Sequence, residues 1–228
     1  MSLLAFGCSV THGADLASPY ESDKNVELSY PNLVAKQLGI DCNNYAVNAI
    51  SNEGIFHKIL ELTPQHNDIT AMIVGWTADV REHWHCEGRD WFIIPNYAGC
   101  MMRTTAPAKK VAWKKSWQIT DISVQAISDD RDYLDPLVKH YEFLVKYKFN
   151  FDEYKKKRQH YVETIRLYCQ SKGITLIETY WAGNSDGNGM ILSWPDLNRH
   201  PNIDEHERFA SQIINKYTLI TNHKLITK

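Results

Sequence analysis

A chain of 228 residues, of which 43% are hydrophobic, is long enough to bury a core, and its length fits one large α/β domain. Its formal net charge of −2 excludes the basic face of a dedicated nucleic-acid-binding protein. No charged leader precedes a long apolar stretch, so we expect a cytoplasmic protein without a signal peptide or membrane span. The five cysteines are scattered without CxxC spacing, which favours reduced thiols.

The first predicted element is a buried strand over Leu3–Phe6, which ends at Gly7 and opens into the turn Cys8–Gly13. Ligands in open α/β sheets bind at the carboxyl ends of strands, so Ser9 in this turn is a candidate nucleophile. Alternatively, Ser9 and Thr11 merely cap the following helix. Because neighbouring side chains on a strand point to opposite faces, we expect Cys8 to be buried and structural.

Strands and helices are predicted to alternate along most of the remaining chain. In chain order they are a helix over Ser29–Gly39, a strand over Cys42–Val47, a helix capped by Ser51 or Asn52 with Ile55, Ile59 and Leu62 on one side, a strand over Thr70–Gly75, a helix over Phe151–Lys172, a strand over Ile174–Tyr180 and a helix over Asp204–Tyr217. Lys155–Arg158 is expected to be a solvated helix face, and Asp204 and Glu207 have the spacing of a capping box. The alternation predicts a parallel sheet covered by helices on both faces.

This alternation is interrupted between Val80 and Ser128, where charges surround four tryptophans, Trp84, Trp91, Trp113 and Trp117. We expect an irregular insertion of loops and short helices that acts as a lid or a partner-binding surface, followed by a helix within Asp129–Tyr147. The tryptophans could stack on sugar rings, or form the core of a small subdomain or a protein interface. His83 and His85 could share a metal with Glu82 or Cys86, but no complete ligand set is identifiable, and we predict no metal site.

Polar residues lie at four places where predicted strands end or the last helix begins, namely Ser9, Asn48–Asn52, Trp76–Asp79 and Asp196–His200. If the sheet is parallel, these places converge on one edge. Ester hydrolysis by a serine needs a base, donors for the oxyanion and a group that orients the base, and these residue types can supply all three.

The four places resemble the blocks of the SGNH (GDSL-type) hydrolase superfamily of esterases, lipases and carbohydrate deacetylases. Gly7–Gly13 is similar to the family's Gly-Asp-Ser block, and Asp196–Asn202 is similar to its Asp-x-x-His-Pro block. The resemblance implies a flavodoxin-like three-layer α/β/α sandwich, with Ser9 as the nucleophile and His200 as the base. It implies Asp196 as the acid, although Leu197 occupies the position three residues before His200 where the family has its acid. Either the loop absorbs one extra residue, or Ser9 and His200 act as a dyad in which a backbone carbonyl orients the imidazole.

The two middle blocks imply the oxyanion hole. Ala49 matches the family's glycine, whose backbone N–H is a donor, and Thr77 stands where the Gly-x-Asn-Asp block has its donor asparagine. The implied donors are therefore the N–H groups of Ser9 and Ala49 and the hydroxyl of Thr77. Weaker candidates, for substrate contact, are His12, Asn52 and Trp76, of which His12 could instead satisfy its turn and Asn52 cap its helix.

We therefore predict a single domain over residues 1–228, with an insertion at about 80–128. It would act as a serine esterase without a cofactor, removing a small acyl group such as acetyl from a carbohydrate or similar ester. Neither nucleic acid nor membrane is an expected partner.

Two other functional classes stay open for this protein. One is a catalytically inactive binding or assembly protein of the same fold, for instance a virion component whose insertion holds a protein partner. The other is a metal-dependent hydrolase that uses His83–Cys86.

Overall fold

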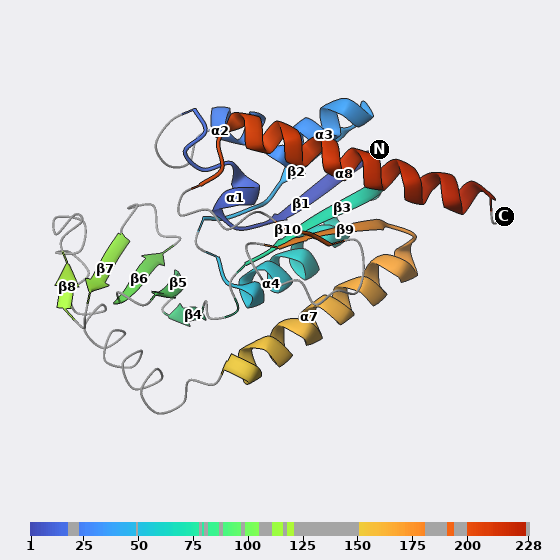
Figure 1. The fold of residues 1–228 in the computed structure, drawn as a ribbon. Coiled ribbons are helices and arrows are strands. Elements are labelled where there is room, and N and C mark those ends of the chain that lie inside the picture. The colour runs from blue at the N-terminus through green and yellow to red at the C-terminus, as the bar shows by residue number, and fades with distance from the viewer. Residues whose placement is uncertain are drawn as a thin grey trace. The chain divides into compact units, whose positions relative to one another are not determined.

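The computed structural model describes residues 1–17, 23–48, 50–77, 79, 82–86, 89–96, 99–104, 111–115, 118–120, 151–180, 191–193 and 200–226. The chain divides into two compact units. Unit 1 consists of Met1–Ala78 and Tyr161–Lys228, and unit 2 of Asp79–His160. Unit 1 contains a parallel sheet and unit 2 an antiparallel one (Figure 1).

Unit 1 is built on a five-stranded sheet in which every neighbouring pair of strands is parallel. Its strands are β1 (Ser2–Gly7), β2 (Asp41–Asn44), β3 (Ile69–Trp76), β9 (Thr175–Tyr180) and β10 (Ile191–Ser193). They lie side by side in the order β2-β1-β3-β9-β10. This doubly wound order is that of flavodoxin-like sheets, so the predicted fold class is confirmed.

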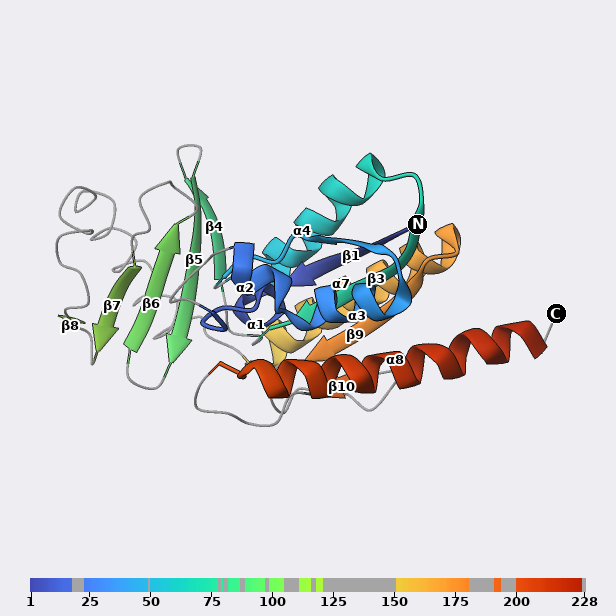
Figure 2. The ribbon, with the colours of Figure 1, turned by 90° about the horizontal axis from the view of Figure 1, so that it is seen from above.

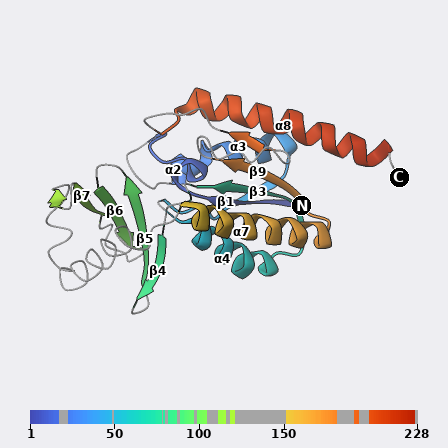
Figure 3. The ribbon, with the colours of Figure 1, turned by 60° about the horizontal axis from the view of Figure 1, so that its bottom comes forward.

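Helices cover both faces of this sheet, as Figure 3 shows. They are α1 (Ser9–His12), α2 (Asp23–Glu27), α3 (Tyr30–Leu38), α4 (Asn52–Leu62) with the short 3₁₀ turn η1 (Thr63–Gln65), α7 (Phe151–Lys172) and α8 (Ile203–Ile226). Helices α3 and α8 pack together on one face, with the rings of Tyr30 and Phe209 edge to face at 5.1 Å (Figure 2). On the other face, Phe56 of α4 stacks on Tyr161 of α7 at 4.7 Å. Unit 1 is therefore a three-layer α/β/α sandwich.

The core of unit 1 follows from the apolar runs of its central strands. Leu3–Phe6 of β1 and Ala71–Val74 of β3 are all at most 1% exposed, as expected for strands covered on both faces. Cys8, Cys42 and Cys169, the cysteines with described side chains, are free thiols, in agreement with the prediction. Among the helices that the structure describes, none combines the length and apolar character that crossing a membrane requires.

Helix α8 begins one residue earlier than the sequence indicates, and this changes its capping. The Asn202 side chain accepts the Glu205 N–H at 3.0 Å, while the Glu205 carboxylate accepts the Asn202 N–H at 2.7 Å. This is a reciprocal capping box. The predicted pair of Asp204 and Glu207 is therefore wrong, because both residues lie within the helix.

Unit 2 replaces the expected loops and short helices with a five-stranded antiparallel meander. Its strands are β4 (Glu82–Cys86), β5 (Arg89–Asn96), β6 (Gly99–Thr104), β7 (Val111–Lys115) and β8 (Gln118–Thr120). The prediction of loops and short helices was wrong because antiparallel strands need only short turns, and aromatic residues such as the paired Trp84 and Trp91 favour strands. The helix predicted within Asp129–Tyr147 lies outside the described residues.

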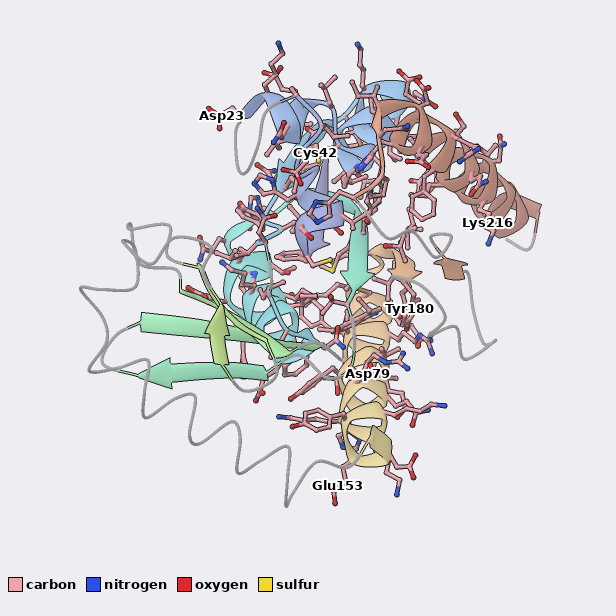
Figure 4. All side chains as sticks on the ribbon, turned by 60° about the vertical axis from the view of Figure 1, so that its left-hand side comes forward. Asp23, Cys42, Asp79, Glu153, Tyr180 and Lys216 are labelled. Atoms are coloured by element: carbon pink, nitrogen blue, oxygen red, sulfur yellow. The ribbon has the colours of Figure 1, made fainter. Side chains whose placement is uncertain are left out.

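One residue of the predicted solvated face of α7 is buried. Lys155, Lys156 and Lys157 are exposed, as expected. Arg158 is only 2% exposed, and its guanidinium pairs with the carboxylate of Asp79, which is labelled in Figure 4, at 2.5 Å. The prediction for Arg158 is therefore wrong, because a buried guanidinium is retained where a carboxylate pairs with it.

Candidate active site

A tight strand–turn–helix connection presents Ser9 at the carboxyl edge of the sheet. Strand β1 ends at Gly7, Cys8 is the extended N-cap residue, and α1 begins at Ser9. The helix ends after one turn at Gly13, which must be glycine because its φ of 87° is left-handed and a Cβ there would overlap the Asn25 carbonyl. Ser9 is half-buried, whereas the Cys8 side chain is 3% exposed, which confirms that Cys8 is a core residue.

The other thiols of unit 1 are also unsuited to act as nucleophiles. Burial raises the pKa of Cys42 to about 12, and burial together with the nearby charge of Glu178 raises the pKa of Cys169 to about 12. A thiol must ionise to attack a substrate, and these thiols stay protonated at neutral pH. Ser9 is therefore the better candidate nucleophile at this edge.

Two glycines allow α1 to lie directly on the sheet. Gly7 and Gly75 are register partners on β1 and β3, and a Cβ on either would overlap the Thr11 hydroxyl. That hydroxyl shares a hydrogen bond with Tyr30 (3.1 Å), which shares another with Thr179 (3.0 Å). This buried trio of hydroxyl groups holds α1, and with it Ser9, in place.

The base predicted from the sequence meets the predicted nucleophile. The distance from His200 Nε2 to Ser9 Oγ is 3.0 Å, across 191 positions of sequence. His200 lies just before α8, which brings the end of the chain to the first strand's turn. An imidazole that carries its proton on Nδ1 has a lone pair on Nε2, which can accept the hydrogen of the serine hydroxyl.

The carboxylate on the other imidazole nitrogen belongs to a residue that the sequence did not indicate. Asp15 Oδ2 lies 2.7 Å from His200 Nδ1, the length of a charge-assisted hydrogen bond. Asp15 has a left-handed φ of 66°, which aspartate tolerates better than most residues. In the sequence Asp15 follows Gly13 by two residues, and no local pattern marks it as a site residue. Asp196, the predicted acid, lies outside the described residues and stays a prediction.

The predicted oxyanion donors follow three adjacent strands of the sheet. Ser9 is the first residue of α1, a position whose N–H has no acceptor within the helix. The Thr77 hydroxyl, one residue beyond β3, is buried and has no hydrogen-bond partner in the part of the chain that is described. The backbone after β2 continues along β1, since the Val47 N–H donates to the Gly7 carbonyl (2.9 Å). Ala49 itself lies outside the described residues, so its role stays a prediction.

Asn52 has a different role from the predicted substrate contact. Its side chain is 5% exposed, accepts the Thr77 N–H at 2.8 Å and donates to the Thr77 carbonyl at 3.1 Å. The N-cap of α4 is Ser51, whose hydroxyl accepts the Gly54 N–H. Asn52 therefore fixes the backbone of Thr77, and only the hydroxyl of Thr77 stays available to an oxyanion.

Trp76 is a core residue, and its assignment to substrate contact is wrong. Its side chain is 1% exposed, and its indole N–H donates to the buried carboxylate of Glu178 at 3.0 Å. The Arg166 guanidinium donates to the same carboxylate at 2.6 Å. His12 is half-buried at the end of α1, and its contact with substrate stays a prediction.

The described side chains contain no group of three or more histidine, cysteine, aspartate or glutamate residues that could hold a metal ion. The side chains of His83 and His85 are not among those described. Both residues lie on strand β4.

No protein-family model and no curated protein matches this sequence. Similar solved structures include a carbohydrate esterase whose active site displays divergent catalytic and non-catalytic binding functions, at 13% identity over 96% of this chain and 64% of that chain, with a TM-score of 0.47. A lipolytic protein of the G-D-S-L family from Desulfitobacterium hafniense matches at 12% identity over 93% and 98% of the two chains, with a TM-score of 0.34. An acetyl xylan esterase from the rumen bacterium Butyrivibrio proteoclasticus matches at 13% identity over 97% and 64%, with a TM-score of 0.40.

The chain thus spans 64% of the length of both esterases.

Proposed function

We propose that this chain is a serine esterase that hydrolyses small acyl esters through an acyl-enzyme on Ser9. The observation that carries this proposal is the 3.0 Å contact between Ser9 Oγ and His200 Nε2. It lies at the carboxyl edge of a parallel sheet, and a carboxylate contacts the second imidazole nitrogen at 2.7 Å. Nucleophile, base and orienting group are the three elements that activate a serine.

In the proposed reaction, His200 Nε2 takes the hydroxyl proton of Ser9 while Oγ attacks the ester carbonyl. The imidazolium then gives this proton to the departing alcohol oxygen, and the C–O bond of the ester breaks to leave the acyl-enzyme. Water, deprotonated by the same nitrogen, attacks the acyl carbon and releases the acid and free Ser9. The N–H groups of Ser9 and Ala49 and the Thr77 hydroxyl would stabilise the oxyanion in both steps.

We propose acetyl as the acyl group and a carbohydrate as the alcohol. The support is the resemblance of the four sequence blocks to a superfamily that includes carbohydrate deacetylases, together with the tryptophans of unit 2, whose rings could stack on sugars. Hydrolysis of p-nitrophenyl acetate, butyrate and octanoate would test the acyl preference, with the acetate expected to react fastest. Release of acetate from acetylated xylan would test the alcohol.

The first experiment is labelling of the folded protein with a fluorophosphonate, together with p-nitrophenyl acetate hydrolysis. Wild type should be labelled, and Ser9→Ala and His200→Ala should lose roughly a thousandfold or more in kcat, because the two residues act as a unit. Ser211→Ala is the matched control, because this serine is exposed on α8. Labelling that persists in Ser9→Ala would place the nucleophile elsewhere. A folded wild type that is neither labelled nor active would favour the inactive binding protein of the same fold.

A further inference from the structure

We infer that Asp15, on the same turn as the nucleophile, is the carboxylate that orients His200. The inference rests on the proposed function and names a positioning residue for the same site. Ser9, Asp15 and His200 all belong to unit 1. Asp15 contacts His200 and not Ser9, so it acts on the reaction through the imidazole.

The chemistry of the neutral imidazole offers one N–H to an orienting carboxylate. Neutral histidine has a single N–H, and the proposed base must leave Nε2 unprotonated, so the proton is on Nδ1. That N–H points to Asp15 Oδ2 at 2.7 Å, a full hydrogen bond to an ionised acceptor.

The turn that contains Asp15 is fixed by its own hydrogen bonds. The N–H groups of Gly13 and Ala14 both donate to the Ser9 carbonyl, at 3.0 and 2.9 Å. Beyond Asp15, the Ala17 N–H donates at 2.7 Å to the side chain of Asn25, which is fully buried. One turn therefore holds the nucleophile at its start and the acid near its end, and only the base comes from another part of the chain.

The exposure of the pair sets the size of the expected effect. The side chains of His200 and Asp15 are 36% and 52% exposed, so water and salt weaken their attraction. Loss of a buried triad aspartate lowers kcat by about ten-thousandfold in other serine hydrolases. For this half-exposed pair we expect a smaller loss, roughly 10- to 100-fold.

The test compares Asp15→Asn with Asp196→Asn. Asparagine keeps the shape of the side chain and tolerates the left-handed backbone, so the turn is retained. Asp15→Asn should lower kcat for p-nitrophenyl acetate roughly 10- to 100-fold while KM stays within about twofold, because Asp15 acts through the imidazole of His200. Asp196→Asn should keep kcat within about twofold. Asp23→Asn, at an exposed position on α2, is the matched control.

A low-field proton NMR resonance from the His200 Nδ1–H would report its hydrogen bond to Asp15. If Asp15 only stabilised the turn, replacing it would not remove this resonance. The resonance should be present in wild type and in Asp196→Asn, and absent from Asp15→Asn and His200→Ala. Wild-type kcat in Asp15→Asn, or an equal loss in Asp196→Asn, would overturn this inference and leave the esterase proposal intact. A folded wild type that fluorophosphonate does not label would overturn both.

Discussion

Two polar clusters lie on opposite sides of the single turn of α1, and they differ in how far they are buried. Ser9, at the start of the turn, faces His200 and Asp15, whose side chains are partly exposed. Thr11, two residues later, faces Tyr30 and Thr179 in the interior, where Thr11 and Tyr30 are at most 2% exposed. A buried hydrogen bond is costly to lose, whereas an exposed one is easily replaced by water. The buried cluster should therefore support stability and the exposed cluster activity.

The largest effect expected from disturbing the buried cluster comes from Gly75→Ala. A Cβ at this position would overlap the Thr11 hydroxyl, with the Tyr30 and Thr179 hydroxyls at 3.2 and 3.3 Å. Thr11 cannot move without losing its bond to Tyr30, so we expect the free energy of unfolding to fall by about 3 kcal/mol or more. Urea unfolding followed by circular dichroism would measure it.

Gly39→Ala is the control for the backbone part of this effect. Gly39 has a φ of 66° and open space around its Cβ position, so the substitution strains only the dihedral, at about 1 to 2 kcal/mol. The double variant Thr11→Ala/Gly75→Ala should lose less free energy of unfolding than the two single variants lose together. Thr11→Ala removes the hydroxyl with which the new Cβ at position 75 would clash. Additive effects would show that the clash is relieved in another way.

A second effect concerns the buried histidine beside Tyr30. His206 Nδ1 accepts the Tyr30 N–H at 3.0 Å, and burial lowers the pKa of His206 to about 4, a shift that His200 adds to and Glu205 opposes. The unfolded histidine binds its proton below about pH 6.5, whereas the folded one binds it only below about pH 4. The unfolded state therefore holds more protons between these values, and stability falls as the pH falls from 6.5 to 4, by on the order of 3 kcal/mol.

Urea unfolding at several pH values would check this dependence. His206→Asn should be less stable at pH 7, because a smaller side chain fills the site, but its stability should change less between pH 6.5 and 4. His57→Asn is the control, because His57 is 60% exposed and should keep the wild-type pH dependence. An unchanged slope in His206→Asn would assign the acid sensitivity to other groups.

The residues that could be predicted from the sequence are those with local signals. Phe151–Lys172 has the bounds of the observed helix because its amphipathic pattern and Gly173 define both ends. Ser9 and His200 lie at predicted element ends, so parallel topology brings them to one edge. The contact of Asp15 with His200 joins positions 185 residues apart, and no pattern near either residue encodes it. Trp76 was misplaced because a strand end does not reveal which face its last side chain occupies.

The smallest expected effect on the free energy of unfolding comes from disturbing the exposed cluster. Asp15→Asn and His200→Ala remove a pair whose side chains are 52% and 36% exposed, so the free energy of unfolding should change by less than about 1 kcal/mol. Tyr30→Phe is the buried counterpart, since it leaves the Thr11 and Thr179 hydroxyls without their shared partner. It should cost about 1 to 3 kcal/mol and leave kcat for p-nitrophenyl acetate within about threefold. A site variant that loses as much stability as Tyr30→Phe would mean that the Ser9 turn depends on His200 for its fold, and the division between the two sides of α1 would not hold.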